Sequence, residues 1–546
     1  MDKIIIYQIF TRLYGNKNTT RKPLGTIEEN GCGKLNDFTP SVLKQIREMG
    51  VTHVWYTGII RHATMTDYTA YGIPRQHPAV VKGRAGSPYA ITDYYDIDPD
   101  LAVNVDKRME EFERLVNRTH RAGLKMIIDF VPNHVARQYK SIAKPEGVRD
   151  LGEDDDTTHG FDPQNNFYYC PGQGFSPYFD LYHGELFPYE ETPAKATGND
   201  CFHNAPGIND WYETVKLNYG VDYYAGHVGH FNPVPDTWKK MLHILLYWAA
   251  KGIDGFRCDM AEMVPAEFWA WATPQVKEQY PDIIFIGEVY NPQEYRNYLT
   301  SGFDLLYDKV GMYDAVSDVL CHHRETSAIS WAWQQTDDIK HHMLYFLENH
   351  DELRLAGDFF VGDAWKALPG FVTCLLMQQN PFMLYAGQEW GERGMDQEGF
   401  SGLDGRTTIF DYWSLQPERD EALIAYYKKV LAIARTHKAI SDGTMFDLMY
   451  ANGQYRRQFA FFRKSKKDLL LVVSNFDDIP FTMGLTIPAH AFEYLGLEEG
   501  LYKATDLLTG VETLIELRCD GAVGINLEAR GSVVLSLLEK GHPINK

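Results

Sequence analysis

The sequence predicts an α/β fold: a (β/α)8 TIM barrel with an inserted domain after strand three and a C-terminal antiparallel β-sandwich domain. Three observations predict this fold. Eight short apolar runs recur before about residue 440, helical patterns separate them, and short β-type runs with turns follow. Strands that are apolar on both faces are typical of a parallel sheet covered by helices. Eight strand and helix repeats are typical of a closed barrel.

The barrel strands are predicted from their apolar runs. They are IIIYQIF (4–10), HVWYTGI (53–59), KMIIDFV (125–131), GIDGFRCD (252–259), IIFIGEV (283–289), FDLLYD (303–308), HMLYFLE (342–348) and PFMLYAG (381–387). Helical periodicity between them is clearest at 105–123, 236–252 and 363–379. The helix after the first strand is predicted to begin with Thr39 as N-cap and Pro40 at its first position.

Two regions depart from this alternation. The segment 135–235 is rich in Gly, Pro, Asn and Tyr and too irregular for one crossover helix. The C-terminal runs are FAFFRK, DLLLVVSNF, GLTIPAH, GAVGINLEA and GSVVLSLLE. We therefore divide the chain into a first barrel part (1–134), an inserted domain (135–235), a second barrel part (236–440) and a C-terminal domain (441–546).

Composition excludes several classes of partner. The chain has 546 residues, of which 44% are hydrophobic, and a net charge of −21. Such a charge repels nucleic acid and anionic membranes, and no apolar run is long enough to span a bilayer. A neutral, hydroxyl-rich substrate is compatible with this charge. The sequence does not indicate an oligomeric state.

The cysteines and the N-terminus bear on the compartment. Seven cysteines lie scattered without metal-binding spacing, so we expect reduced thiols; a Cys170–Cys201 disulfide is the less favoured alternative. The start MDKIIIYQIF lacks the features of a signal peptide. We expect a cytoplasmic protein, the alternative being a periplasmic or secreted form whose leader has been removed.

Ionisable side chains gather at the predicted C-terminal strand ends, where barrels of this kind place their active sites. They are Asp129, Asn133 and His134 (strand three), Arg257 and Asp259 (four), Glu288 (five), and Glu348, Asn349, His350 and Asp351 (seven). Any one of them alone is more often a helix cap or a structural residue. Together they indicate a site, and two carboxylates flanking a bond are what glycoside hydrolysis needs.

Strand four is unusually charged for a buried strand. Arg257 and Asp259 are two residues apart and share one face, so both can point into the site. We expect Asp254 to be structural at the strand's entry and Cys258 to pack on the opposite face. The role of Glu262 is open.

These motifs resemble those of the α-amylase superfamily of glycoside hydrolases (family thirteen). DFVPNH, GFRCDMAE, GEVY and ENHD are similar to its four signature regions, in order and on the expected strands. VKLNYG (215–220) resembles the motif near the end of the family's inserted domain, and SPYAITDYYDIDP (87–99) resembles its tyrosine-bearing segment after strand two. The markers span residues 87–351, and the domain pattern extends the resemblance over the whole chain.

The resemblance implies roles for the residues that match its motifs. Asp259 would be the nucleophile, Glu288 the general acid/base and Asp351 the third carboxylate, which orients sugar hydroxyls and stabilises the transition state. Arg257 would hold Asp259 ionised by lowering its pKa. The remaining substrate-binding residues would be Tyr89, which stacks on the sugar, and His134 and His350, which hydrogen-bond it. Some superfamily members lack the acids and are transporter subunits; this chain keeps all three.

The family resemblance gives mixed indications of a calcium site. The chemistry requires no cofactor, but Asn133 matches a common calcium ligand of the family, which is compatible with a structural Ca²⁺ ion. Asp154–Asp156 and Asp162 could supply further oxygens or form a solvated loop. A Lys-His pair that helps to hold calcium in many α-amylases is replaced by Glu262 and Met263. The segment TIEENGCG (26–33) fits poorly to another calcium loop of the family.

The leading hypothesis is a retaining hydrolase of α-1,4-glucans, meaning starch or maltodextrins. A 4-α-glucanotransferase or an α-glucosidase or neopullulanase-type enzyme would use the same acids. A non-catalytic glycan-binding protein is a remote alternative, since the acids are complete. A metallohydrolase using His134, His350 and Asp259 is disfavoured, because Arg257 would lie beside the metal.

Overall fold

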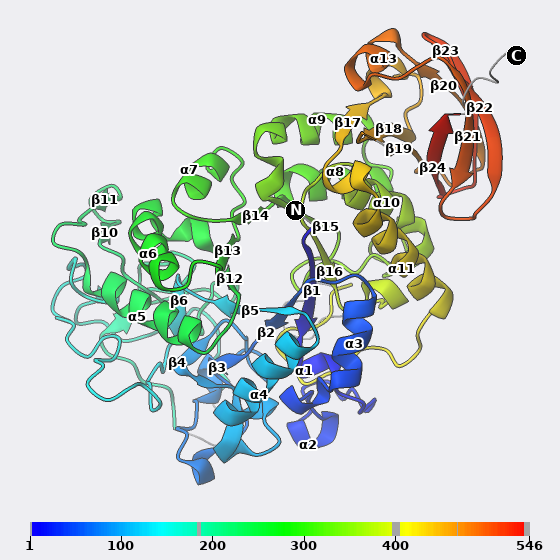
Figure 1. Ribbon diagram of the computed structural model, residues 1–546. Coiled ribbons are helices and arrows are strands. Elements are labelled where there is room, and N and C mark those ends of the chain that lie inside the picture. Colours follow the sequence, from blue (N-terminus) through cyan, green and yellow to red (C-terminus); the bar gives the residue numbers. More distant parts are fainter. Residues whose placement is uncertain (1–2, 183–186, 396–404, 467, 540–546) are drawn as a thin grey trace, which may run out of the picture.

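The computed structural model describes residues 3–182, 187–395, 405–466 and 468–539, and it contains a closed eight-stranded parallel barrel (Figure 1). All eight predicted strands are present and pair in chain order. They are β1 (Ile5–Phe10), β2 (His53–Thr57), β5 (Lys125–Phe130), β12 (Gly255–Cys258), β13 (Ile284–Gly287), β14 (Leu305–Tyr307), β15 (Met343–Phe346) and β16 (Phe382–Tyr385). The predicted fold class is confirmed.

The barrel strands are apolar on both faces because both faces are buried. Alternate side chains such as Ile6, Trp55 and Leu344 pack together inside the barrel, and their neighbours pack against the surrounding helices. The helices are α3 (Pro40–Glu48), α4 (Arg108–Arg121), α5 (Asp236–Ala250), α6 (Ala266–Gln279), α7 (Tyr295–Thr300), α8 (Asp314–Leu320), α9 (Ser327–Gln335), α10 (Leu368–Leu376) and α11 (Glu421–Thr436). The Thr39 side chain caps α3 by accepting from Val42 N, and Pro40 begins it, as predicted.

The segment between β5 and α5 is built from loops and short antiparallel pairs. These pairs are β6 (His134–Ala136) with β9 (Thr214–Lys216), β7 (Tyr169–Cys170) with β8 (Ala194–Lys195), and β10 (Val221–Asp222) with β11 (Val228–Gly229). The first pair places His134 opposite Lys216 in register, directly after the end of barrel strand β5. This pairing therefore brings the later part of the segment back beside its beginning, near the end of β5.

The C-terminal part is antiparallel and lies to one side of the barrel, away from the segment between β5 and α5 (Figure 1). Its main sheet has the order β17 (Thr444–Asp447), β18 (Gln458–Lys464), β19 (Leu469–Asn475), β24 (Ser532–Glu539), β21 (Gly500–Asp506) and β22 (Glu512–Leu517). A second sheet pairs β20 (Phe481–Ile487) with β23 (Gly521–Leu527), and α13 (Ala489–Leu495) follows β20.

All seven cysteines belong to the described residues and are free thiols, so the alternative of a Cys170–Cys201 disulfide is wrong. Within the described ranges, no helix combines the length and the apolar character needed to cross a membrane.

Candidate active site

The C-terminal ends of the barrel strands open into a pocket of about 490 Å³. Five of the predicted site residues line it: Tyr89, His134, Asp259, Glu288 and Asp351. The other predicted residues, Asn133, Arg257 and His350, are almost wholly buried and hold this lining in place. Further lining residues are Lys82, Ser87, Ile208, Asn209, Trp211, Glu213, Thr214, Met260, Tyr290, Arg406, Ile409 and Phe410.

Arg257 connects the two predicted catalytic acids. Its Nη1 lies 2.9 Å from Asp259 Oδ1, and its Nη2 lies 2.9 Å from Glu288 Oε2. Its Nε donates to Tyr307 Oη at 3.1 Å, which fixes the guanidinium plane. The side chain is fully buried, and a buried charge is stable only when it is paired in this way. The planar fork thus sets Asp259 and Glu288 side by side on adjacent strands.

The pKa of Asp259 differs from the expectation. Burial raises it well above its ordinary value, the negative charge of Glu288 raises it further, and Arg257 lowers it. The lowering effect expected of Arg257 is present, but burial and Glu288 outweigh it. The desolvation of a carboxyl group in a closed pocket outweighs one cationic neighbour.

Glu288 is held by two further donors. Met260 N donates to Oε2 at 2.8 Å, and Tyr290 Oη donates to Oε1 at 2.6 Å. Met260 has φ 44°, in the left-handed region, which aims its N–H at Glu288. A left-handed conformation in a residue other than glycine is costly and persists where the surroundings enforce it. The turn after β12 therefore positions the acid at the end of β13.

His350 couples the third carboxylate to the tyrosine of the site. Its Nε2 lies 2.6 Å from Tyr89 Oη and 3.1 Å from Asp351 Oδ2, while the Gln8 amide nitrogen lies 2.8 Å from its Nδ1. Burial, followed by the charge of Arg257, lowers the pKa of His350 well below its ordinary value. His350 is therefore neutral near pH 7 and acts as a hydrogen-bonding group. Burial also raises the pKa of Asp351, against the lowering effect of Arg257.

His134 and Trp211 line the pocket together. The ring centroids of the two side chains lie 5.3 Å apart at an angle of 56°. Burial, followed by the charge of Lys216, lowers the pKa of His134 to about 3, so this ring is neutral as well.

Asn133, the predicted calcium ligand, already has a cation beside its side-chain oxygen. Lys216 Nζ lies 2.7 Å from Asn133 Oδ1 and 2.6 Å from Asp200 Oδ1. The Asn133 amide nitrogen donates to Gly198 O at 2.8 Å. The Lys216 side chain is 2% exposed. A Ca²⁺ ion needs six to eight oxygen ligands, and here an ammonium group takes the position beside these oxygens. The residues around Asn133 therefore do not fit a calcium ion.

The acidic run 154–156 forms loop contacts instead. Asp154 pairs with Arg149, and Asp155 accepts from Asn166 N and Phe167 N. Asp156 accepts from Thr158 N, and Asp162 accepts from Gln164 N, as solvated-loop residues do. Across the described ranges of the chain, no group of three or more His, Cys, Asp or Glu side chains is arranged to hold a metal ion.

The remaining charges of strand four have structural contacts. Asp254 accepts from Met126 N and contacts His120 Nε2, both at 2.7 Å, at the entry of β12. This confirms its predicted structural position. Cys258 is buried in the core outside the barrel. Glu262 accepts from Asn291 N at 3.1 Å and so ties the loops after β12 and β13 together.

Several residues of the site escaped sequence reasoning. Trp211 comes from the segment between β5 and α5, where no periodicity indicates which side chains approach the barrel. Lys216 lies within the VKLNYG motif (215–220), a resemblance that assigns no role to its lysine. Tyr290 directly follows the GEV motif, and its position two residues after an acid was the available signal. Gln8, below His350, lies on an otherwise apolar strand, and a buried polar residue there could have been noticed.

The chain is similar to known proteins over most of its length. The family model described as "Alpha amylase, catalytic domain" matches residues 8–426. Alpha-amylase MalA from Haloarcula japonica is 24% identical, over 88% of this chain and 56% of its own length. A cyclomaltodextrinase from Bacillus sp. is 25% identical, over 88% of this chain and 74% of its own length. The chain thus spans little more than half the length of the first of these relatives.

Solved structures show the same fold. An α-amylase from Geobacillus thermoleovorans, complexed with acarbose, superposes with a TM-score of 0.66 at 19% identity, covering 99% of both chains. A maltogenic α-amylase from Thermotoga neapolitana gives a TM-score of 0.65 at 20% identity, covering 98% of this chain and 99% of its own.

Proposed function

This chain belongs to the α-amylase family of glycoside hydrolases, and we propose that it cleaves α-1,4-glucosidic bonds of starch, maltodextrins or related α-glucans with retention of anomeric configuration. The observation that supports this most directly is the pairing of Asp259 and Glu288 through Arg257. Neighbouring strands lie about 4.8 Å apart. Carboxylates at their ends can therefore approach the roughly 5–5.5 Å separation used in double displacement.

In the first step, Asp259 attacks the anomeric carbon and forms a covalent glycosyl ester. Glu288 gives its proton to the departing glycosidic oxygen, so the leaving chain ends in a neutral hydroxyl group. In the second step, Glu288 takes a proton from water, and the water oxygen attacks the same carbon and releases Asp259. Each step inverts the centre, so the product keeps the α configuration.

The neighbouring groups serve the sugar and the developing charge. Asp351 is an anion for the oxocarbenium-like transition state and an acceptor for sugar hydroxyls. His350 and His134, both neutral, can donate or accept hydrogen bonds without adding positive charge near that transition state. Tyr89 lies beside them, with its ring available to the apolar face of a sugar.

A second candidate is transfer or cleavage at another linkage by the same acids. The cyclomaltodextrinase match favours it, as does a neopullulanase from Thermoactinomyces vulgaris, 25% identical over 53% of this chain and 39% of its own length. A 4-α-glucanotransferase or α-glucosidase would share the acids and differ in how the pocket admits a sugar acceptor or a long chain.

The test is a product profile from maltoheptaose, pullulan and cyclodextrin, with the Asp259→Asn variant as the control for contaminating activity. Shorter maltooligosaccharides from maltoheptaose support hydrolysis of α-1,4 bonds. Products longer than maltoheptaose support glucan transfer, and preferential opening of cyclodextrin supports cyclomaltodextrinase-type action. No turnover of any α-glucan would contradict the proposal.

A further inference from the structure

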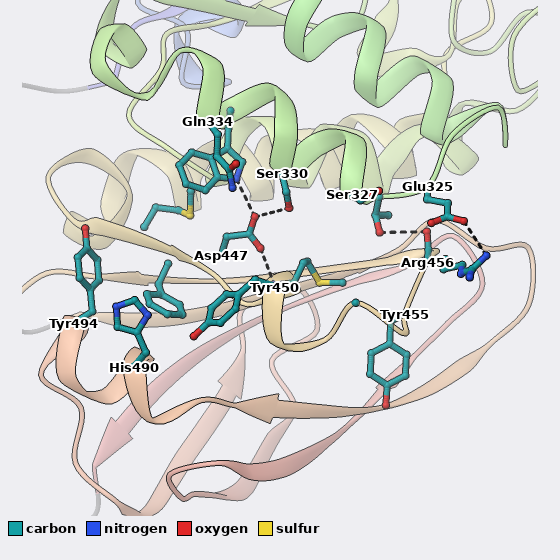
Figure 2. A pocket seen from close by; sticks show the side chains of 16 residues that line it. Glu325, Ser327, Ser330, Gln334, Asp447, Tyr450, Tyr455, Arg456, His490 and Tyr494 are labelled. Carbon is teal, nitrogen blue, oxygen red and sulfur yellow. Dashed lines mark hydrogen bonds and ion pairs between the residues drawn. The ribbon is translucent and has the colours of Figure 1, made fainter.

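A second pocket lies between helix α9 and the C-terminal domain (Figure 2). It has a volume of about 430 Å³, which is within the range of small-molecule sites. Its walls come from α9 and the two residues before it, from β17 and the segment after it, and from α13. None of its lining residues lines the active-site pocket.

One wall of this second pocket is aromatic. The ring centroid of Phe446 lies 6.0 Å from that of Tyr450, 5.4 Å from that of His490 and 5.7 Å from that of Tyr494. Tyr450 is 63% exposed and Tyr494 is 60% exposed, although both rings are large and partly apolar. Figure 2 shows these rings gathered on one side of the pocket. Solvent-exposed aromatic groups clustered in this way are typical of ligand sites.

The other wall is polar and fixed. Asp447 accepts from Ser330 Oγ at 2.5 Å and from Trp333 Nε1 at 2.9 Å, which joins β17 to α9. Thr326 Oγ1 donates to Gln458 O at 2.9 Å, which joins the segment before α9 to β18. The pocket is therefore held open by contacts between the barrel and the C-terminal domain. The exposed amide of Gln334 points toward it from above (Figure 2).

The charges of the pocket disfavour ionic ligands. Among the described residues that line the pocket, Arg456 is the single lysine or arginine. Its Nη1 lies 3.1 Å from Glu325 Oε1. A phosphate or carboxylate ligand would find this cation already paired, within a chain of net charge −21. A neutral ligand with hydroxyl groups and apolar faces fits better. Its faces would lie on the tyrosine rings, and its hydroxyls would reach Gln334 and Ser327.

We infer that this pocket is a second binding site for a short stretch of α-glucan chain. The choice of glucan rests on the proposed function, because the substrate is the ligand of this chemistry that the enzyme meets continually. A chain held there would keep a long substrate near the enzyme between cleavage events. Short substrates, which cannot reach both pockets, would gain nothing.

The binding test uses the Asp259→Asn protein, which we expect to bind without turnover. Calorimetric titration with maltoheptaose should resolve two classes of sites in this parent. Adding Tyr450→Ala and Tyr494→Ala should leave one class. The matched control is Trp331→Ala, which removes a 56% exposed ring from the same helix α9 but outside the pocket, and should keep both classes.

The kinetic test uses the active enzyme with the same substitutions. We expect the tyrosine double variant to lower kcat/KM on soluble starch by about five- to tenfold, the loss of two stacking rings, and to leave kcat/KM on maltotriose unchanged. Gln334→Ala, a surface change, should weaken starch cleavage in the same selective way. A single class of sites in the Asp259→Asn parent, or equal losses on starch and maltotriose, would overturn the second site alone. Absence of turnover by the wild-type enzyme would instead overturn the proposed function.

Discussion

Lys216 Nζ lies 2.7 Å from Asn133 Oδ1, the oxygen for which the family resemblance suggests a metal ion. The pairing of β6 with β9 brings them together, because it sets residues 214–216 beside residues 134–136. Burial lowers the pKa of Lys216, and the adjacent Asp200 opposes that effect. The Lys216 ammonium group thus occupies the position beside Asn133 Oδ1 and Asp200 in which a metal cation would lie.

We therefore expect stability without calcium. Exhaustive chelation should leave the Tm of the wild-type protein unchanged. Lys216→Ala should lower the free energy of unfolding by about 1–3 kcal/mol, because it leaves the buried Asn133 oxygen without a donor. Added Ca²⁺ should raise the Tm of this variant more than that of an exposed-lysine control, Lys239→Ala. A clear fall in the wild-type Tm on chelation would disprove this account.

Asp259→Asn should abolish turnover and preserve the fold. An amide cannot form the glycosyl ester, and loss of a nucleophile typically costs about 10⁴-fold or more in kcat. Circular dichroism and oligosaccharide binding should remain near those of the wild type. Activity within tenfold of the wild type would show that another group is the nucleophile.

The first product released should be the α anomer. Asp259 and Glu288 lie on adjacent strands, whereas an inverting pair needs roughly 6.5–9.5 Å to admit a water molecule between carboxylate and sugar. Proton NMR of fresh hydrolysate, recorded before mutarotation, measures this directly. An initial β anomer would contradict both the mechanism and the role of Asp259.

In the pH profile of kcat/KM, the midpoint of the acid limb should lie above the ordinary pKa range of aspartate. Burial and the charge of Glu288 raise the pKa of Asp259, and its ionised form must attack. As the pH falls through this raised pKa, Asp259 takes up a proton and the rate falls. Since the pKa of His134 is about 3, His134→Asn should lower the rate without moving the limb. If the acid limb disappeared in the His134→Asn variant, the limb would instead report the titration of His134.

Tyr290→Phe should lower kcat by about tenfold, because one net hydrogen bond to Glu288 is worth roughly 1 kcal/mol or more near a charged group. The fold and KM should change little. Tyr295→Phe is the matched control: within the described part of the chain, the buried Tyr295 hydroxyl has no hydrogen-bond partner. Equal effects of the two substitutions on kcat would show that the Tyr290 hydrogen bond to Glu288 does not contribute to catalysis.

The barrel could be predicted because its signals are local. Each strand is an apolar run, and the acids at 259, 288 and 351 follow directly from the strand ends. The contact between Lys216 and Asn133 joins positions 83 residues apart through irregular chain, where no periodicity applies. The raised pKa of Asp259 depends on how completely the pocket excludes water, which a motif does not encode. The second pocket likewise arises only when α9 meets the C-terminal sheet.

The lining of the active-site pocket comes from two parts of the chain. Asp259, Glu288 and Asp351 belong to the barrel, whereas Trp211 lies on the segment anchored by the β6–β9 pair. That segment can therefore be replaced, in evolution or by protein engineering, without changing the barrel that carries the acids. A graft cut at the β6–β9 junction would carry a new preference for substrate shape into the same reaction machinery, leaving the acids and their arginine untouched.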